Sequence, residues 1–222
     1  MVEFKYINHS CFILATDKDA IIFYPYLDGN PRGIKPSDIK VSHVLVTHNH
    51  GDHLGSAYEI AKNNNATFIS TAEVAHAAAE AGVKAYPMHI GGVLPFPFGK
   101  VRVTQAFHGS GIAGGHACGF VVDFYGTTVY FAGDTGIFGD MSLLGQLEKL
   151  DYAILPIGNT FTMGPEDARL AVKLLGVKKV IPVRYNTWPK IAQDPKKFKA
   201  AVEKDGVAQV FIVAPGESLT LA

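Results

Sequence analysis

The run Thr47-His48-Asn49-His50-Gly51-Asp52-His53 decides how the rest of this chain of 222 residues is interpreted. It begins at the end of HVLVT, residues 43–47, a short apolar and β-branched segment that predicts a strand. His48 and His50 are two residues apart at the strand end, so an extended backbone turns both rings to the same side. Neutral imidazole and carboxylate are preferred ligands of Zn²⁺ and neighbouring transition metals. The run therefore predicts a metal site where this strand ends.

Further ligands of such a site must come from other parts of the chain. Asp52 and His53 lie where the chain turns into a predicted helix, and they are expected to point at a second position nearby. His108 directly follows one predicted strand, and Asp134 lies two residues after the end of another. Active sites of mixed α/β proteins gather just beyond the carboxyl ends of strands. His108 and Asp134 are therefore candidate ligands that join the histidine run.

Apolar periodicity and turn residues divide the rest of the chain into alternating strands and helices. The predicted strands are Phe4–Ile7, Cys11–Ala15, Ala20–Tyr24, His43–Thr47, Ala66–Ser70, Val101–Phe107, Gly119–Phe124, Thr127–Ala132, Tyr152–Leu155, Lys179–Val183 and Val210–Val213. The predicted helices are Leu54–Lys62, Ala72–Ala81, Met141–Leu150, Pro165–Leu175 and Pro195–Lys204. Residues 91–98, punctuated by Gly and Pro, are predicted to form turns. This order predicts an α/β protein with two packed sheets and outer helices, in a single domain over residues 1–222.

The composition excludes several classes of protein. Lys+Arg and Asp+Glu both number 20, and a binder of nucleic acid or anionic membranes normally carries a basic excess. No run approaches the roughly 18 apolar residues of a membrane span, and the first residues lack the apolar region of a signal peptide. Cys11 and Cys118 form no CxxC pair and are expected to be small buried residues in a reducing compartment. We therefore expect a cytoplasmic protein with a small-molecule substrate and no nucleic-acid or membrane partner, and a homo-oligomer stays open.

Several motifs together resemble one protein superfamily. The HxHxDH run, the later His108 and the Gly-Asp-Thr-Gly at residues 133–136 are similar to the metallo-β-lactamase fold superfamily. Other stretches narrow the resemblance: GNP at 29–31, MHIGG at 88–92, FHGS at 107–110, LPIG at 155–158, FTMGPEDA at 161–168 and YNTWP at 185–189. Over nearly its whole length the chain resembles the UPF0173 family of small metal-dependent hydrolases, relatives of the L-ascorbate-6-phosphate lactonases. The resemblance implies a four-layer αββα sandwich with a mono- or dinuclear metal centre.

The resemblance also implies a role for each candidate ligand. The implied first ion is held by His48, His50 and His108, the second by Asp52 and His53, with Asp134 bridging the two. The implied reaction is metal-assisted hydrolysis, in which an activated water attacks the carbonyl or phosphoryl centre of a small ester, lactone or phosphodiester. Asp52, with His53 beside it, is expected to take part in catalysis by orienting that water. Zinc is the expected metal, although His/Asp sites also accept manganese, iron and nickel.

Three positions depart from the family pattern. The family has a histidine ligand before Tyr-x-Thr, where this chain has Arg184. Arginine stays protonated and has no lone pair for a metal, so the second metal site loses a ligand and gains a positive charge. Tyr24 stands where the family commonly has an aspartate that supports the metal loop, and Phe131 stands where many members have a histidine. His9, in a segment similar to the family's Gly-His-Ser, is a candidate for a role beside the ligands or on the substrate.

Three interpretations of Arg184 stay open. In the first, Arg184 points away and another group serves as ligand, His116 being the nearest candidate by family position. In the second, only the first metal binds tightly, and Arg184 holds a carboxylate or phosphate of the substrate. In the third, the protein keeps the fold but is a catalytically silent metal- or ligand-binding protein. A nuclease of the same superfamily is disfavoured by the zero net charge and by a chain too short for an additional domain. We favour a metal-dependent hydrolase with an incomplete second metal site.

Overall fold

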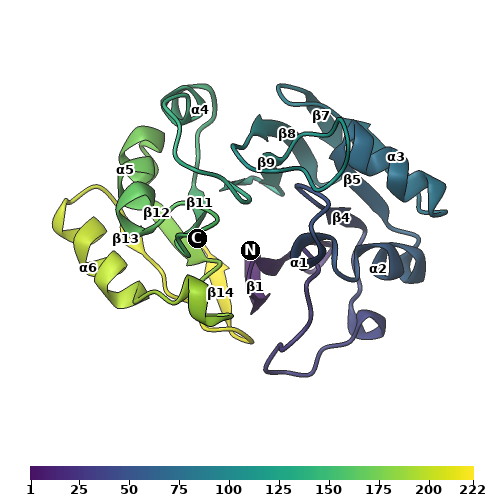
Figure 1. Ribbon diagram of the computed structural model, residues 1–222, viewed down its shortest axis with the longest axis horizontal. Coiled ribbons are helices and arrows are strands. Elements are labelled where there is room, and N and C mark those ends of the chain that lie inside the picture. The colour runs from purple at the N-terminus through teal and green to yellow at the C-terminus, as the bar shows by residue number, and fades with distance from the viewer. The chain divides into compact units, whose positions relative to one another are not determined.

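The computed structural model describes residues 1–222 as two compact units, each built around its own sheet (Figure 1). The first unit consists of residues 1–92, 109–118 and 213–222, and the second of residues 93–108 and 119–212. Both sheets are mixed and both units carry helices, which confirms the expected α/β class. The single domain over residues 1–222 stays a prediction.

The sheet of the first unit has seven strands in the order β14-β1-β2-β3-β4-β5-β6. The strands from β14 to β3 are antiparallel, and those from β3 to β6 are parallel. Their bounds are β1 Val2–Asn8, β2 Cys11–Ala15, β3 Ala20–Phe23, β4 His43–Leu45, β5 Thr67–Thr71, β6 Ala85–Met88 and β14 Ser218–Leu221. Strands β3, β4 and β5 of the parallel half are buried at nearly every position, so both of their faces are covered, whereas Tyr86 and Pro87 of the edge strand β6 are exposed.

The helices of the first unit follow the strands of the parallel half. They are the 3₁₀ helix η1 Pro36–Asp38 and the α-helices α1 Gly51–Leu54, α2 Ala57–Asn64 and α3 Ala72–Glu80. Helix α2 lies against β4 and β5, and helix α3 against β5 and β6 (Figure 1). Their buried residues Ile60 and Val74 share one apolar core with Val44 and Phe68 of the sheet. This core holds the end of β4, where the histidine run begins, in a fixed position.

The sheet of the second unit also has seven strands, in the order β13-β12-β11-β10-β9-β8-β7. Strands β7 and β8 pair antiparallel, as do β9 and β10, whereas β10 to β13 run parallel. Their bounds are β7 Val93–Phe96, β8 Gly99–Gln105, β9 Cys118–Phe124, β10 Thr127–Phe131, β11 Tyr152–Pro156, β12 Lys179–Val183 and β13 Gln209–Val210. Asp134 follows the carboxyl end of β10, and Arg184 follows the carboxyl end of β12 in the same parallel half.

The helices of the second unit have clear signals at their ends. They are α4 Met141–Leu147, α5 Pro165–Leu175, the 3₁₀ helix η2 Pro189–Ile191 and α6 Pro195–Lys204. Asp194 caps α6 by accepting hydrogen bonds from the amides of Lys196 and Lys197. Helix α5 begins at a proline and ends at Gly176, whose left-handed backbone terminates it. These local signals explain why α5 matches its predicted bounds and why α6 lies where a helix was expected.

The sequence-based prediction omits strands β6 and β14, and two further segments correct it. Residues 91–98, predicted as turns, contain β7, which pairs with β8 through Val93 and Arg102. Strand β7 is an edge strand, so Pro95 removes no hydrogen bond from the interior of the sheet. The helix predicted over residues 54–62 is instead two helices, because the chain turns at Gly55 with φ +43°. A Cβ at Gly55 would collide with the carbonyl of Pro25, so this close approach requires glycine.

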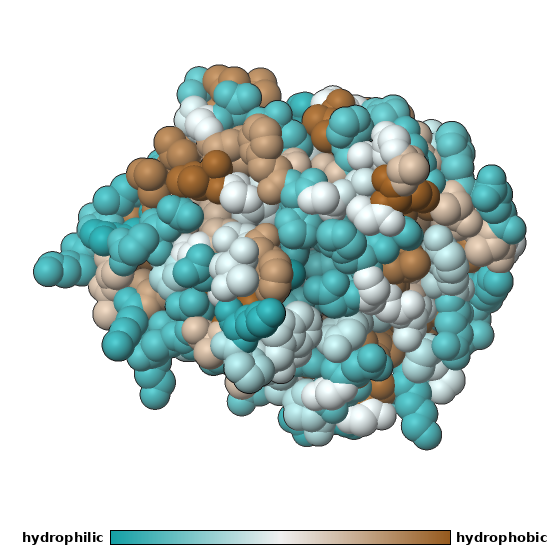
Figure 2. Space-filling model, viewed as in Figure 1, coloured by the Kyte–Doolittle hydropathy of each residue, from teal (hydrophilic) through white to brown (hydrophobic).

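On the face drawn in Figure 2 hydrophilic residues predominate, and the most extended hydrophobic area lies at the upper left, with smaller hydrophobic patches elsewhere. The longest helix, α5, has 11 residues, and no helix in the structure is long and apolar enough to cross a bilayer.

Candidate metal centre

The histidine run lies in a bend and a single helical turn after β4. The strand ends at Leu45, two residues before the predicted end, and the chain then bends. His50 has an extended backbone and directly precedes α1, and its carbonyl accepts hydrogen bonds from the amides of His53 and Leu54. The ring centroids of His48 and His50 are 4.7 Å apart, and those of His48 and His53 are 4.1 Å apart. This local fold brings the imidazoles of His48 and His50 together, as expected, and places the ring of His53 beside them rather than apart at a second position.

The environment of these rings differs from that of ordinary loop histidines. His48 and His53 are fully buried, and His50 is half-buried. Asn49 ties the bend to the glycine-rich loop 109–115, because its amide donates to the carbonyl of Ser110 at 2.7 Å. Burying polar rings is costly unless they have polar partners. A site that uses the imidazole nitrogens explains this burial better than a polar loop in which the histidines occur by coincidence.

Tyr24, which follows β3, is a candidate site residue that the sequence analysis recorded only as a departure from the family. Its hydroxyl lies in hydrogen-bond contact with Thr47 Oγ1 and 3.3 Å from His48 Nδ1. Thr47 Oγ1 is also 2.9 Å from His48 Nδ1. The Tyr24 ring meets the His53 ring edge-on, with centroids 3.9 Å apart. Tyr24 and Thr47 thus fix the orientation of His48 through its Nδ1 atom.

His9 belongs to the same group of residues in the first unit. It lies in the turn between β1 and β2, and its side chain is buried. Its Nε2 atom is 3.4 Å from Asp52 Oδ2, and His53 Nε2 is 3.1 Å from the same oxygen. The structure therefore places His9 beside Asp52 and His53, the two residues that the resemblance assigns to the second ion.

In the second unit, Arg184 forms a two-pronged ion pair with Asp134. Its Nε donates to Asp134 Oδ1 at 2.7 Å, and its Nη2 lies 2.6 Å from Asp134 Oδ2. The two residues are 3% and 1% exposed, so water screens this pair little. Arg184 therefore faces Asp134, contrary to the interpretation in which it points away and leaves its place to another ligand.

His108 lies next to the same ion pair. Its Nε2 atom is 3.6 Å from Asp134 Oδ2. The preceding residue is tied to the loop after β10, because the amide of Phe107 donates to Thr135 Oγ1 at 2.9 Å and the Phe107 carbonyl accepts from the amide of Gly136. The second unit thus brings His108, Asp134 and Arg184 together.

The remaining candidate, His116, and the two cysteines are not part of these groups. His116 is exposed directly after the glycine-rich loop, where its carbonyl accepts a hydrogen bond from Thr71 Oγ1. Cys11 and Cys118 are buried and free, as expected, and burial raises the pKa of both thiols far above the usual range. Their burial disfavours the thiolate form that a nucleophile needs.

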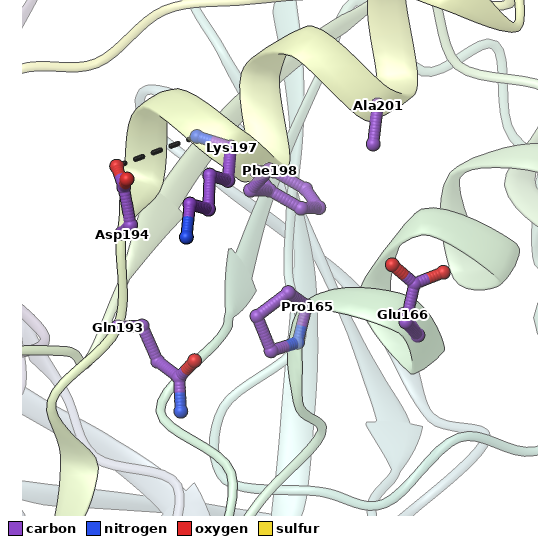
Figure 3. Close-up of a pocket in the computed structure, with 7 residues that line it drawn as sticks. All are labelled: Pro165, Glu166, Gln193, Asp194, Lys197, Phe198 and Ala201. Atoms are coloured by element: carbon purple, nitrogen blue, oxygen red, sulfur yellow. Dashed lines mark hydrogen bonds between the residues drawn. The ribbon is translucent and has the colours of Figure 1, made fainter.

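A pocket of about 270 Å³ in the second unit lies at the starts of α5 and α6 (Figure 3). Its lining residues are Pro165, Glu166, Gln193, Asp194, Lys197, Phe198 and Ala201. Figure 3 shows Asp194 engaged with the backbone amide of Lys197 as a helix cap. None of the predicted site residues lines this pocket, and it offers no imidazole.

The donor set fits a divalent transition metal. The first unit supplies the imidazoles of His9, His48, His50 and His53 and the carboxylate of Asp52. Imidazole with carboxylate suits zinc and equally manganese, iron or nickel, whereas magnesium and calcium prefer oxygen ligands alone. The chemistry of these residues thus agrees with the expected cofactor class and leaves the metal's identity open.

Comparison with known proteins assigns the chain to a family. The profile of the Beta-lactamase superfamily domain matches residues 24–185. A UPF0173 metal-dependent hydrolase of Natranaerobius thermophilus is 52% identical over 99% of this chain and 100% of its own length, and one of Desulforamulus reducens is 45% identical with the same coverage. The solved structure of Igni18, a metallo hydrolase from Ignicoccus hospitalis, has a TM-score of 0.91 and 35% identity, covering 98% of this chain and 97% of its own. The expected metallo-β-lactamase-like fold is thereby confirmed, and the chain belongs to the UPF0173 family of metal-dependent hydrolases.

Proposed function

We propose that this protein hydrolyses a small ester, lactone or phosphodiester with one tightly held divalent transition metal, zinc being the first choice. The ligands would be His48, His50 and His108, as the family resemblance implies. The observation that supports a single tight site is the ion pair between Arg184 and Asp134, which engages both oxygens of the carboxylate expected to bridge two ions.

Electrostatic magnitudes favour one ion over two. A divalent ion about 5 Å from a guanidinium is repelled by about 7 kcal/mol at an effective dielectric of about 20. Pulling the guanidinium off Asp134 instead would leave a buried charge without its partner, which costs about 3–5 kcal/mol. Both routes to the family's second site are therefore expensive in this chain.

The contact with Asp134 also bears on what Arg184 does. Two of its three nitrogens already donate to the carboxylate, and the residue is buried. This geometry favours Arg184 as a local counter-charge over a role in which it clamps a free substrate anion. As a counter-charge, the guanidinium supplies part of the positive charge that a second ion would bring to Asp134.

The reaction needs no protein nucleophile. When bound, the metal supplies a Lewis acid that polarises the scissile group and acidifies a water molecule. The Asp52 side chain is 26% exposed, so its carboxylate can orient that water and accept its proton. His53 Nε2, 3.1 Å from Asp52 Oδ2, holds the carboxylate in place. Tyr24 and Thr47 hold His48 in the ring orientation that a ligand requires.

The proposal includes a small-molecule substrate, in keeping with the zero net charge, and a cytoplasmic location, in keeping with two unpaired cysteines. The second candidate function is a catalytically silent metal- or ligand-binding protein. The same Arg184–Asp134 ion pair favours it, because the pair takes away a ligand that two-metal hydrolysis in the family uses.

The deciding experiment measures metal content and hydrolysis on one preparation. Protein purified without chelator is analysed for transition metals and tested on chromogenic ester, lactone and phosphodiester substrates. We expect about one tightly bound ion per chain, the number that one complete ligand set holds, together with metal-dependent turnover of one class. Metal content far below one ion per chain after reconstitution would end the hydrolase proposal, and one bound ion without turnover would favour the silent protein.

The ligand assignment is tested separately. His50→Ala should lose most of the tightly bound metal, whereas His76→Ala, which changes an exposed histidine on α3, should keep it. Full retention of metal in the His50 variant would show that the assignment is wrong.

A further inference from the structure

The backbone at His9 holds an unusual conformation for a residue of its type. His9 has φ +56°, a left-handed conformation that residues with a Cβ rarely adopt. The Tyr6 hydroxyl donates a hydrogen bond to the His9 carbonyl at 2.6 Å and so fixes this turn. As a result the imidazole is buried, with 1% of the residue exposed. Conformations of this kind persist at functional sites, where the surrounding structure holds them in place.

The turn delivers the His9 ring to α1. His9 Nε2 and His53 Nε2 lie 3.4 Å and 3.1 Å from Asp52 Oδ2. One ligand atom from each of the three residues lies within 4.8 Å of the other two. Two atoms that each bind a zinc ion at about 2.0–2.1 Å in tetrahedral geometry lie about 3.3 Å apart. The two measured separations match this spacing.

The chemistry of these three side chains suits one ion. Two imidazoles and one carboxylate are an established ligand set for divalent zinc, iron and manganese. All three residues belong to the first unit, so the group does not depend on Asp134, which Arg184 engages in the second unit.

We propose that His9, Asp52 and His53 form a second divalent-metal site of lower affinity, in which His9 takes over from the histidine that the family has at the position of Arg184. This inference rests on the proposed function, which supplies the tight first metal site, and adds a second metal site of lower affinity. The weaker ion fills at metal concentrations above those that fill the first site. The competing explanation is that His9 and His53 only hydrogen-bond Asp52 and orient it for catalysis.

The test is a calorimetric titration of metal-free protein with Zn²⁺. The wild type should show one tight and one weaker equivalent. His9→Asn removes the imidazole but tolerates the left-handed backbone, and His9→Gly removes the side chain while relieving that backbone. Both variants should keep the tight equivalent. In both variants the affinity for the second Zn²⁺ equivalent should fall by more than about 100-fold, since even partners outside the ligand shell contribute about 10–100-fold to affinity.

The matched control is His43→Asn, which changes another buried histidine of the first unit that starts β4 outside the cluster. It should retain both equivalents. Cobalt-loaded protein gives a second readout, because each coordinated imidazole with an N–H shows a paramagnetically shifted exchangeable proton signal in NMR. At two cobalt ions per chain, the His9 variants should each lose one such signal.

The outcomes separate the two proposals. A weaker equivalent that is unchanged in both His9 variants, or a wild type that binds only the tight ion, would overturn this inference and leave the proposed function standing. A wild type that binds no ion at all would overturn both. Loss of the tight ion in His50→Ala with retention of the weaker one would support the inference further, because it would show two independent sites.

Discussion

The Arg184 guanidinium sets the charge of the site residues in the second unit, because it neutralises a carboxylate that is otherwise buried beside a histidine. Replacing it with the family's ligand tests this directly. We expect Arg184→His to raise the number of tightly bound ions toward two per chain, since the change removes a positive charge and supplies a nitrogen donor. Metal analysis after dialysis against a weak chelator measures this.

Arg184→Met is the matched variant for charge alone. It removes the guanidinium without adding a ligand and leaves Asp134 buried with its charge partner gone, which we expect to cost about 3–5 kcal/mol of unfolding free energy in urea. If Arg184→His binds no more metal than the wild type, Arg184 does not limit the second site.

Tyr24 is the second residue whose replacement is informative, because its hydroxyl and its ring have different partners. Tyr24→Phe keeps the ring against His53 but removes the hydroxyl from Thr47 and His48. We expect the affinity of the tight site to fall about 10–100-fold, the range for groups that hold a ligand in position. Competition of the zinc-loaded protein with a chromogenic chelator gives the affinity.

Tyr130→Phe serves as the control for the Tyr24 change. Tyr130 is also fully buried, but it belongs to β10 of the second unit and is not one of the residues that contact the histidine run in the first unit. Its replacement should leave zinc affinity unchanged. Equal losses in the two variants would mean that the Tyr24 hydroxyl matters for packing rather than for the ligand.

At the scale of elements, the glycine-rich loop 109–115 supports the bend that carries His50. A Cβ at Gly111 would lie 2.8 Å from His50 Cδ2, whereas a Cβ at Gly114 would meet nothing within 4 Å. Both glycines have positive φ, +69° and +73°, so an alanine strains the backbone alike at either position. We expect Gly111→Ala to weaken zinc binding and Gly114→Ala to leave it intact. Calorimetric titration with Zn²⁺ measures both affinities. Equal affinities would show that the loop does not position His50.

The sequence predicts those elements and site residues that local signals encode. Helices α5 and α6 have a proline at their start and clear end signals, and the HxHxDH run marks its own position after β4. The pairing of Arg184 with Asp134 and the approach of His9 to Asp52 join residues distant in the chain. Such contacts depend on strand order and on backbone turns such as that at His9, which no local periodicity reports.

At the scale of the whole molecule, bound metal should contribute to the stability of the folded chain. A ligand that binds only the folded state stabilises it by about 4 kcal/mol when present at about 1,000 times its dissociation constant. We therefore expect chelator treatment to lower the thermal unfolding midpoint of the wild type, as followed by circular dichroism. The His50→Ala variant should respond less to the chelator, and an equal response would contradict the role of His50 in metal binding.

Prolines in two edge strands affect how this protein meets its neighbours. Strand β6 carries Pro87 and strand β7 carries Pro95, and each strand forms one edge of its sheet. An edge strand with free amides is a template onto which another chain can add a strand, and a proline removes one of those donors. Both sheets are therefore protected on one side against edge-to-edge aggregation. A self-association of this chain that used β6 or β7 by strand addition would start with a missing hydrogen bond.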